Sequence, residues 1–293
     1  MTEGGMEMTT VAQPAAKKKI TYRSRGKLII HIVLIIGSFI MIFPFVWMIL
    51  TSFKSNGESL LIPPTIFPRE WLTENYTEVT RTLPFGSLYL NTLLLMLLRI
   101  ICALVFSSMA GFAFAKLRFP FKRFFFFLVL TQMMLPNQIF IIPQYQMLAS
   151  MGKLNSIFAL LFPGLVSAFG TFFLRQFYMS LPNVLSEAAV LDGCNTFQIF
   201  FRIMLPLTKT AMMALAVFTA VFAYSDMMWP LIVNSNINMM TLSAGISSMQ
   251  GQFTTKYPIL MAGSTLAMIP MLVLYLVFQR QFIEGIALTG TKG

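Results

Sequence analysis

The sequence has 293 residues, of which 57% are hydrophobic and 11% charged, and its mean hydropathy is +0.75. This composition excludes a soluble globular domain. The formal net charge of +11 could indicate a nucleic-acid-binding protein. However, the basic residues stand in short groups beside apolar runs, which is the pattern that orients membrane segments. The composition therefore predicts a polytopic membrane protein that contacts lipid and binds no nucleic acid.

Apolar runs long enough to cross a bilayer recur along the chain. The chain is polar or small up to about residue 20, so residues 1–25 predict a disordered cytoplasmic tail, and residues 286–293 predict a second, short cytoplasmic tail. Between them, residues 26–285 hold six runs close to the roughly 20 residues that span a hydrocarbon core at about 1.5 Å per residue. The runs cover residues 28–50, 88–115, 124–142, 157–174, 211–233 and 258–278. The predicted fold class is an all-α membrane protein with six transmembrane helices.

Lysine and arginine are unequally divided between the segments that connect these runs. If the N-terminus is inside, fifteen of the 21 basic residues fall on inner segments, five fall on outer segments, and Arg99 lies within the second run. Basic residues concentrate on the cytoplasmic side of membrane proteins, so both termini are predicted to be cytoplasmic. The connection between the fourth and fifth runs, residues 180–207, then faces the cytosol as well.

This cytosolic connection carries the signals of two short helices joined by a sharp bend. Pro182 can occupy the first turn of one helix, and Asp192 with Gly193 supplies turn chemistry that would stop it. Asn195 can cap a second helix that ends near Pro206. The pattern predicts a helix-turn-helix held against the membrane surface.

The side chains of this helix-turn-helix favour contact with another protein. Ala188 and Ala189 keep one side of the first helix thin, so that a partner can approach closely, and Glu187 and Asp192 can accept charge-assisted hydrogen bonds. The second helix, residues 197–204, is mostly apolar and is expected to pack back on the bundle. An amphipathic connector without a partner is the alternative interpretation.

The spacing of the loop resembles the "EAA" loop of ABC importer permeases, which reads Glu, Ala, Ala, three residues, Gly, nine residues, Ile, one residue, Leu-Pro. The matching residues, with no departure, are Glu187, Ala188, Ala189, Gly193, Ile203, Leu205 and Pro206. The resemblance implies that this loop is a coupling helix that docks on a cytosolic ATPase. We therefore expect these residues, together with Asp192, to couple the chain to that ATPase.

Other stretches resemble the carbohydrate-type permeases, in particular the second permease of maltose-type importers. They are Ser52-Phe53-Lys54, Asn75-Tyr76, Trp229-Pro230-Leu231 and the end of the chain from Gln279, so that the resemblance covers nearly all of the chain after residue 25. It implies a multi-pass protein of the bacterial inner membrane with three kinds of partner: a homologous permease, a cytosolic ATPase dimer and an extracytoplasmic solute-binding protein. ATP and magnesium would be bound by the ATPases, and the implied solute is a sugar, an oligosaccharide or a related polyol or glycerophosphodiester.

Polar residues inside the predicted spans are candidates for a solute path. Arg99 and Asp226 are expensive in lipid and are expected to face the interior of the bundle, where they can form a pair. Thr131 and Gln138 are seven residues apart and are expected to share a helix face, and Pro136 between them permits a bend. The candidate path residues are Gln132, Asn137, Gln138, Tyr224, Asp226 and Trp229. A buried packing seam explains the polar third run about equally well.

The sequence lacks the motifs of an enzyme. It has no G-x-x-x-x-G-K-[ST] stretch that could hold ATP phosphates, its one histidine is His31, and its two cysteines, Cys102 and Cys194, have no metal-site or disulfide spacing. The chain is therefore expected to be a transport subunit with no cofactor or metal of its own. Two rival classes are an ion-coupled secondary transporter working without an ATPase and a non-transporting scaffold. Internal repeats and several intramembrane carboxylates would favour the secondary transporter.

Overall fold

The computed structural model describes residues 24–251 and 255–290, with side chains for residues 27–251 and 255–280. Within these residues, all regular secondary structure is helical. The predicted N-terminal tail, residues 1–25, lies outside the described residues except for its last two, which begin the first helix. Of the predicted C-terminal tail, residues 286–290 continue the last helix, and residues 291–293 lie outside the described part.

Three long helices match the first, second and sixth predicted runs. They are α1 (Ser24–Ser52), α4 (Phe85–Lys116) and α15 (Tyr257–Gly290), the last with a non-helical residue at Phe278. Each contains a stretch long and apolar enough to cross a membrane, and three further pairs of helices, each bent at a short break, raise the candidate spans in the described chain to at most six. Six spans therefore stay a prediction, which requires that each bent pair crosses the membrane as one span.

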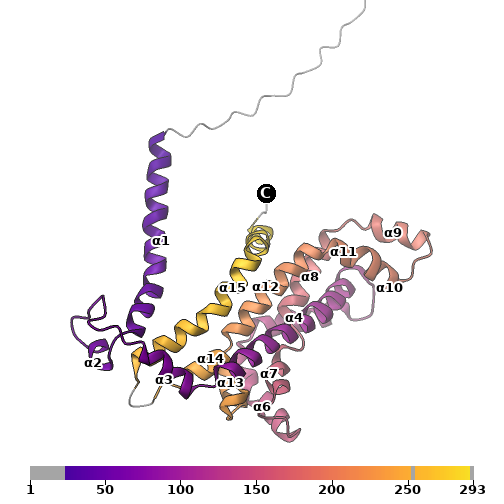
Figure 1. Cartoon of the computed structure of the whole chain (residues 1–293). Helices are drawn as coiled ribbons and strands as arrows, with labels where there is room; N and C mark the ends of the chain where they lie inside the picture. Colours follow the sequence, from indigo (N-terminus) through magenta and orange to yellow (C-terminus); the bar gives the residue numbers. More distant parts are fainter. Residues whose placement is uncertain (1–23, 252–254, 291–293) are drawn as a thin grey trace, which may run out of the picture. The chain divides into compact units, whose positions relative to one another are not determined.

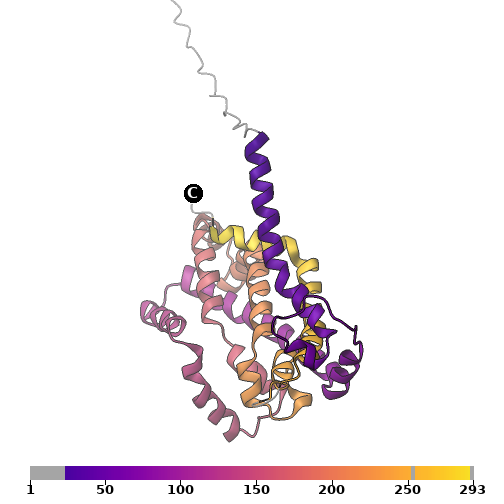
Figure 2. The same cartoon turned by 90° about the vertical axis from the view of Figure 1, so that its left-hand side faces the viewer.

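The third predicted run is not a single helix. It divides into α5 (Lys122–Met134), the 3-10 turn η1 (Asn137–Phe140) and α6 (Ile141–Ser150), with a bend of 102° between the two parts. Pro136 lies at the bend because it has no N–H to donate and forces the preceding Leu135 into an extended conformation. The prediction that Thr131 and Gln138 share one helix face is therefore wrong. Figure 2 shows the two parts, in purple to pink, pointing in different directions.

The fourth and fifth runs are also interrupted. The fourth consists of α7 (Ile157–Leu161), η2 (Phe162–Gly164) and α8 (Ala168–Ser180), with a bend of 44°. The fifth is divided into α12 (Lys209–Ser225) and α13 (Met228–Val233), because Asp226 has an extended backbone with ψ of 108°. The expected continuous helix over residues 211–233 is therefore two helices.

The remaining helical elements are short. They are α2 (Asn56–Ser59), α3 (Glu74–Thr82), α9 (Val184–Leu191), α10 (Thr196–Gln198), α11 (Leu205–Leu207) and α14 (Leu242–Ser247), with the π-helix η3 (Ile199–Met204) and the 3-10 turn η4 (Ile237–Met239). Figure 1 shows α9 and α10 beyond one end of α4, α8 and α12, and α6, α13 and α14 near the other end. This arrangement separates the predicted cytosolic connection from the interrupted half of the fifth run.

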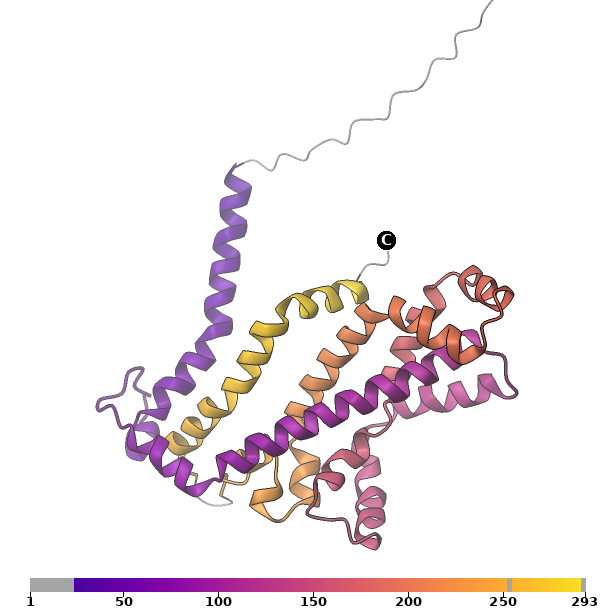
Figure 3. The same ribbon diagram turned by 45° about the vertical axis from the view of Figure 1, so that its right-hand side comes forward.

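The chain divides into two units, residues 1–47 and residues 48–293. In the first unit, the apolar side chains of α1 from Leu28 to Val46 are exposed. In the second unit, α4 contacts α8 and α12, and α12 in turn contacts α15. Figure 3 shows α4, α12 and α15 as the long rods of this unit. Small residues let the rods approach closely: a Cβ at Gly170 would lie 2.4 Å from the Ser107 hydroxyl of α4.

Tyrosine hydroxyls satisfy backbone carbonyls in the middle of α15. Pro270 has no N–H, so the carbonyl of Leu266, four residues earlier, loses its helical partner. The hydroxyl of Tyr89 on α4 donates to this carbonyl oxygen at 2.7 Å, and the hydroxyl of Tyr224 on α12 donates to the next one, Ala267. These bonds tie three rods together at a position where a lipid-facing carbonyl would be left unpaired.

The segment that joins α1 to α4 is ordered by contacts between its two ends. The side-chain amide of Asn75 donates to the carbonyl oxygens of Ser52 at 2.8 Å and of Lys54 at 3.0 Å. The hydroxyls of Ser52 and Tyr76 lie 2.7 Å apart. The two short stretches that resemble the permease family here, residues 52–54 and 75–76, therefore contact each other and close the segment.

Candidate functional site

The helix-turn-helix predicted between the fourth and fifth runs is present. Helix α9 ends at Leu191 and is followed by its C-cap residue Asp192, and Gly193 takes a left-handed conformation with φ of +82°. The N–H of Gly193 donates to the carbonyl of Val190, and the N–H of Cys194 donates to the carbonyl of Ala189. These two hydrogen bonds together are the pattern of a Schellman cap. The predicted stop at Asp192–Gly193 is confirmed, whereas Pro182 lies before the helix rather than in its first turn.

The start of α9 is attached to the long helix α4. The ammonium of Lys116, the last residue of α4, donates to the carbonyl of Leu181 and to the side-chain oxygen of Asn183, both at 2.7 Å. Asn183 is the residue that precedes α9, so the cation fixes the point at which the loop leaves α8. The sequence identified Lys116 only as a basic residue at a membrane face, and no spacing between motif residues indicated this contact.

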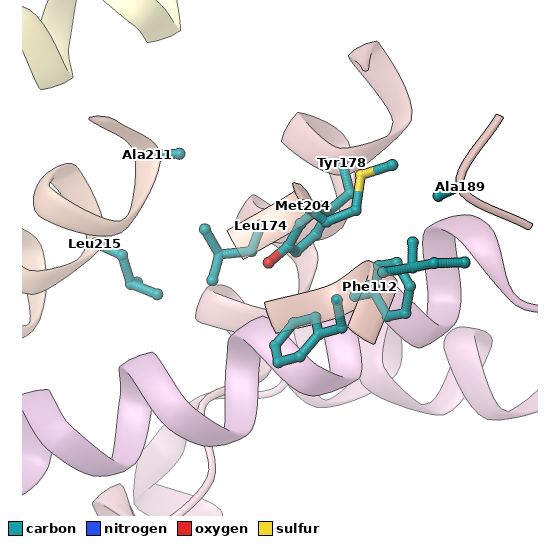
Figure 4. Close-up of a cluster of buried hydrophobic side chains, with 9 residues drawn as sticks. Phe112, Leu174, Tyr178, Ala189, Met204, Ala211 and Leu215 are labelled. Carbon is teal, nitrogen blue, oxygen red and sulfur yellow. The ribbon is translucent and has the colours of Figure 1, made fainter. Parts of the chain in front are cut away.

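The two alanines of the loop face in different directions. Ala189 is buried in a cluster with Phe112 of α4 and with Leu174 and Tyr178 of α8 (Figure 4), whereas Ala188 is exposed. Successive residues on a helix are about 100° apart, so the two methyl groups cannot share a face. The expectation that both alanines face the same side is therefore wrong: Ala188 is exposed, whereas Ala189 is small because α9 packs closely on its own bundle.

The second helix of the loop begins as predicted at Asn195. Its side-chain oxygen accepts a hydrogen bond from the N–H of Gln198 at 2.9 Å, and the side-chain oxygen of Gln198 accepts one from the N–H of Asn195 at 2.8 Å. This reciprocal capping box fixes the direction in which the chain leaves the bend. Ile199, Phe200 and Met204 then enter the same buried cluster as Ala189. The helix thus packs back on the bundle along one side only.

The outward sides of both helices carry exposed apolar side chains, and we call these residues, together with Glu187, the docking face. On α9 the residues that share this side at helical spacing are Val184, Glu187, Ala188 and Leu191, and Leu191 is 89% exposed. On the second helix, Phe197 and Phe201 are exposed as well. Of the other motif residues, Ile203 and Leu205 pack against the buried cluster, and Asp192 and Pro206 are exposed. An apolar surface held on a rigid, well-capped element is typical of a protein–protein contact.

Arg99 and Asp226 form the ion pair that their cost in lipid predicts. An Nη2 nitrogen of Arg99, in the middle of α4, donates at 2.8 Å to a carboxylate oxygen of Asp226 and at 2.8 Å to the carbonyl of Leu160 in α7. Both partners lie where a helix is interrupted, because Asp226 separates α12 from α13 and Leu160 lies just before η2. One buried cation therefore joins the second, fourth and fifth runs.

Gly164 makes room for this arginine. A Cβ at Gly164 would lie 2.8 Å from Nε and 2.9 Å from Cδ of Arg99. Gly164→Ala is expected to destabilise the packed chain by about 1–3 kcal/mol, because the arginine cannot move without losing Asp226 or Leu160. Thermal unfolding of the detergent-purified protein measures this loss. Gly57→Ala is the control, since its Cβ would meet nothing within 4 Å; equal stability of the two variants would contradict the tight contact.

The candidate path residues are not gathered at one place. Gln132, Asn137 and Gln138 are exposed around the bend between α5 and α6. Tyr224 and Asp226 are partly buried near the end of α12. In contrast, Trp229 belongs to the packed core, where its indole N–H donates at 2.8 Å to the carbonyl of Ala159.

The position of Trp229 has a local cause. Pro163 in η2 removes the N–H that would otherwise pair with the carbonyl four residues earlier, Ala159. The indole N–H supplies the missing donor, so Trp229 stabilises the bent fourth run instead of lining a path in this structure. The other aromatic candidate, Tyr224, is partly buried, and its hydroxyl donates to the carbonyl of Ala267 in α15.

Comparisons with known proteins agree with the family resemblance of the sequence. Residues 103–287 match the family described as "Binding-protein-dependent transport system inner membrane component". The arabinooligosaccharides transport system permease protein AraQ of Halalkalibacterium halodurans is 33% identical over 262 residues, covering 87% of this chain and 93% of AraQ. The sn-glycerol-3-phosphate transport system permease protein UgpE of Pectobacterium atrosepticum is 33% identical over 264 residues, covering 87% of this chain and 94% of UgpE.

A solved structure shares the fold. A chain from the crystal structure of a bacterial ABC transporter that imports the acidic polysaccharide alginate superposes with a TM-score of 0.74 at 21% identity, covering 89% of this chain and 99% of the other. The helical fold of this chain is thus shared with a chain of that ABC transporter. The family match covers more than half of the sequence, and both relatives are permease proteins. This chain therefore belongs to the inner membrane components of binding-protein-dependent transport systems and is a transport permease subunit, not an enzyme.

Proposed function

We propose that this chain forms half of the translocation pathway of an ATP-driven importer and that its docking face binds a cytosolic ATPase. The observation that carries the proposal is the exposed apolar surface around Leu191, held rigid by the Gly193 cap and by the burial of Ala189. Glu187 lies exposed on the same side of α9 and can accept a charge-assisted hydrogen bond from the partner. The uneven division of basic residues supports a cytosolic position for this face and for both termini.

The coupling can be mechanical, because the docking face and the long helices share one core. The buried cluster joins α9 and η3 to α4, α8 and α12. Because this core is closely packed, a displacement of α9 must also move these three helices. ATP binding would draw two ATPase subunits together, and the loops of this chain and of a homologous permease would move with them. The free energy that biases the inward- and outward-facing states is then supplied at the ATPases, and this chain needs no catalytic residue.

The solute that we propose is a sugar, an oligosaccharide or a related polyol phosphate, delivered by an extracytoplasmic binding protein. AraQ and UgpE belong to systems named for arabinooligosaccharides and for sn-glycerol-3-phosphate, which are both polyhydroxylated. Tyr224 and Asp226 near the interrupted fifth run, and Gln132, Asn137 and Gln138 around the bend, are the polar candidates of the path. Asp226 is engaged by Arg99, which does not favour the alternative of an ion-coupled carrier.

Leu191→Asp is the sharpest test of the docking face. Burying an unpaired carboxylate in an apolar contact is expected to cost about 2 kcal/mol or more, which is roughly a thirtyfold weaker association. A tagged chain purified in mild detergent should therefore retain its partner permease and lose the ATPase. Leu191→Met keeps an apolar side chain of similar size and is the matched control.

Co-purification of the ATPase with Leu191→Asp at the level of the control would refute the proposed docking site. The complex recovered with the unchanged chain also allows the solute to be assigned. Its ATPase activity, measured with the recovered binding protein and a panel of sugars and polyol phosphates, should rise with one class of these solutes.

A further inference from the structure

The segment between α1 and α3 has its polar and apolar residues reversed relative to an ordinary surface loop. Lys54 is 2% exposed and Glu58 is 8% exposed, whereas Ile62 is 96%, Phe67 70% and Trp71 60% exposed. Charged side chains are almost never buried while large apolar ones face water, unless the apolar ones contact something else. Figure 1 shows this segment as an open loop beside α2.

The exposure of the apolar residues does not come from a loosely held loop. The carboxylate of Glu58 accepts hydrogen bonds from the hydroxyl of Thr65 at 2.8 Å and from the backbone N–H of Arg69 at 3.0 Å. The ammonium of Lys54 donates to the carbonyl of Thr65. These bonds form a polar centre around which the chain is wrapped, and they turn the apolar side chains outward.

Both ends of the loop are held at the end of the first candidate span. The N–H of Leu72 donates at 2.8 Å to the carbonyl of Phe53, and the rings of Phe53 and Trp71 lie 5.3 Å apart. Phe53 directly follows Ser52, the last residue of the apolar stretch Lys27–Ser52. The interfacial layer on each side of a hydrocarbon core is about 5–8 Å thick. Lipid headgroups are therefore the nearest surroundings of the loop.

We propose that residues 60–71 form an interfacial membrane anchor, in which Ile62, Phe67 and Trp71 insert into the boundary between lipid headgroups and acyl chains. The residues from Leu60 to Pro68 include no charge, and the first charged residues, Arg69 and Glu70, are exposed where the chain turns back. Aromatic and aliphatic side chains at this depth anchor membrane proteins. The anchor fixes the depth and rotation of the end of the first span, independently of which solute is transported.

The test measures whether lipid or water surrounds the loop in the assembled complex. Cys102 and Cys194 are replaced by serine, a cysteine is introduced by Ile62→Cys, and a fluorescent bimane label is attached after reconstitution in nanodiscs. Doxyl-labelled lipids should quench most of this fluorescence, whereas iodide in the water should quench little of it.

The matched control is Thr77→Cys on α3. Thr77 shares its exposed helix side with Glu74, Glu78 and Arg81, so its label should respond to iodide and not to the lipid quencher. Phe67→Cys provides a second position if Ile62→Cys does not assemble. Quenching of the loop labels by iodide would overturn the anchor, and so would protection from both quenchers, which would mean that a protein subunit covers the loop. Loss of lipid quenching in detergent-free complexes with the binding protein bound would overturn it too.

Discussion

Gly193→Val should abolish solute uptake while the chain still inserts in the membrane and assembles with its partner permease. Gly193 has a φ of +82°, which a β-branched residue reaches only at a cost of about 1–3 kcal/mol. No atom lies within 4 Å of the added Cβ, so the cost arises from the backbone and not from crowding. The cap would relax to another turn, and α9 would leave the angle at which Ala189 reaches the buried cluster. Uptake per amount of chain in the membrane measures the effect.

Two matched variants separate this effect from general strain. Gly193→Asn should retain most uptake, because asparagine tolerates the left-handed conformation. Gly152→Val introduces similar strain at a φ of +63° in the turn after α6, far along the chain from the loop, and should lower stability without uncoupling the ATPase. Normal uptake by Gly193→Val, or equal uptake by the valine and asparagine variants, would show that the bend angle does not carry the coupling.

The sequence was sufficient for those features that depend on one local signal. The three long apolar helices follow from the length of their apolar runs, and the end of α9 follows from Asp192 and Gly193, because only the local backbone decides them. The pairing of Arg99 with Asp226 was also predictable, since a charge in lipid has few partners to choose from.

The remaining features depend on neighbours that no local pattern identifies. Pro136 indicated a bend in the third run, but not the 102° between its two parts, which the surrounding helices determine. Nothing in the sequence around Trp229 indicates that its indole N–H is needed at Ala159, on a different helix. The two faces of α9 were missed for the same reason: an Ala-Ala pair shows that one side is thin, and tertiary contacts decide which alanine is buried.

Asp226→Ala should destabilise the chain more than any other single substitution considered above, by about 3–5 kcal/mol, because it leaves the buried guanidinium of Arg99 without its counter-ion. The cost should appear as a lower thermal midpoint of the detergent-purified protein and as less chain in the membrane. Arg99→Met alone removes the cation and leaves Asp226 partly exposed, so it should cost less.

The double variant Arg99→Met with Asp226→Ala distinguishes a charge effect from a packing effect. Removing both charges should restore most of the stability, since replacing a buried ion pair by apolar groups is often neutral. It should not restore all of it, because the carbonyl of Leu160 loses the donor that Arg99 provides, which costs about 1–3 kcal/mol for an unpaired buried group. If the double variant were as unstable as Asp226→Ala, the arginine would be needed for joining α7 to α4 and not for its pairing with Asp226. A double variant that regains stability but does not transport would instead indicate that the pair acts in the movement of the fifth run, whose helix is interrupted at Asp226.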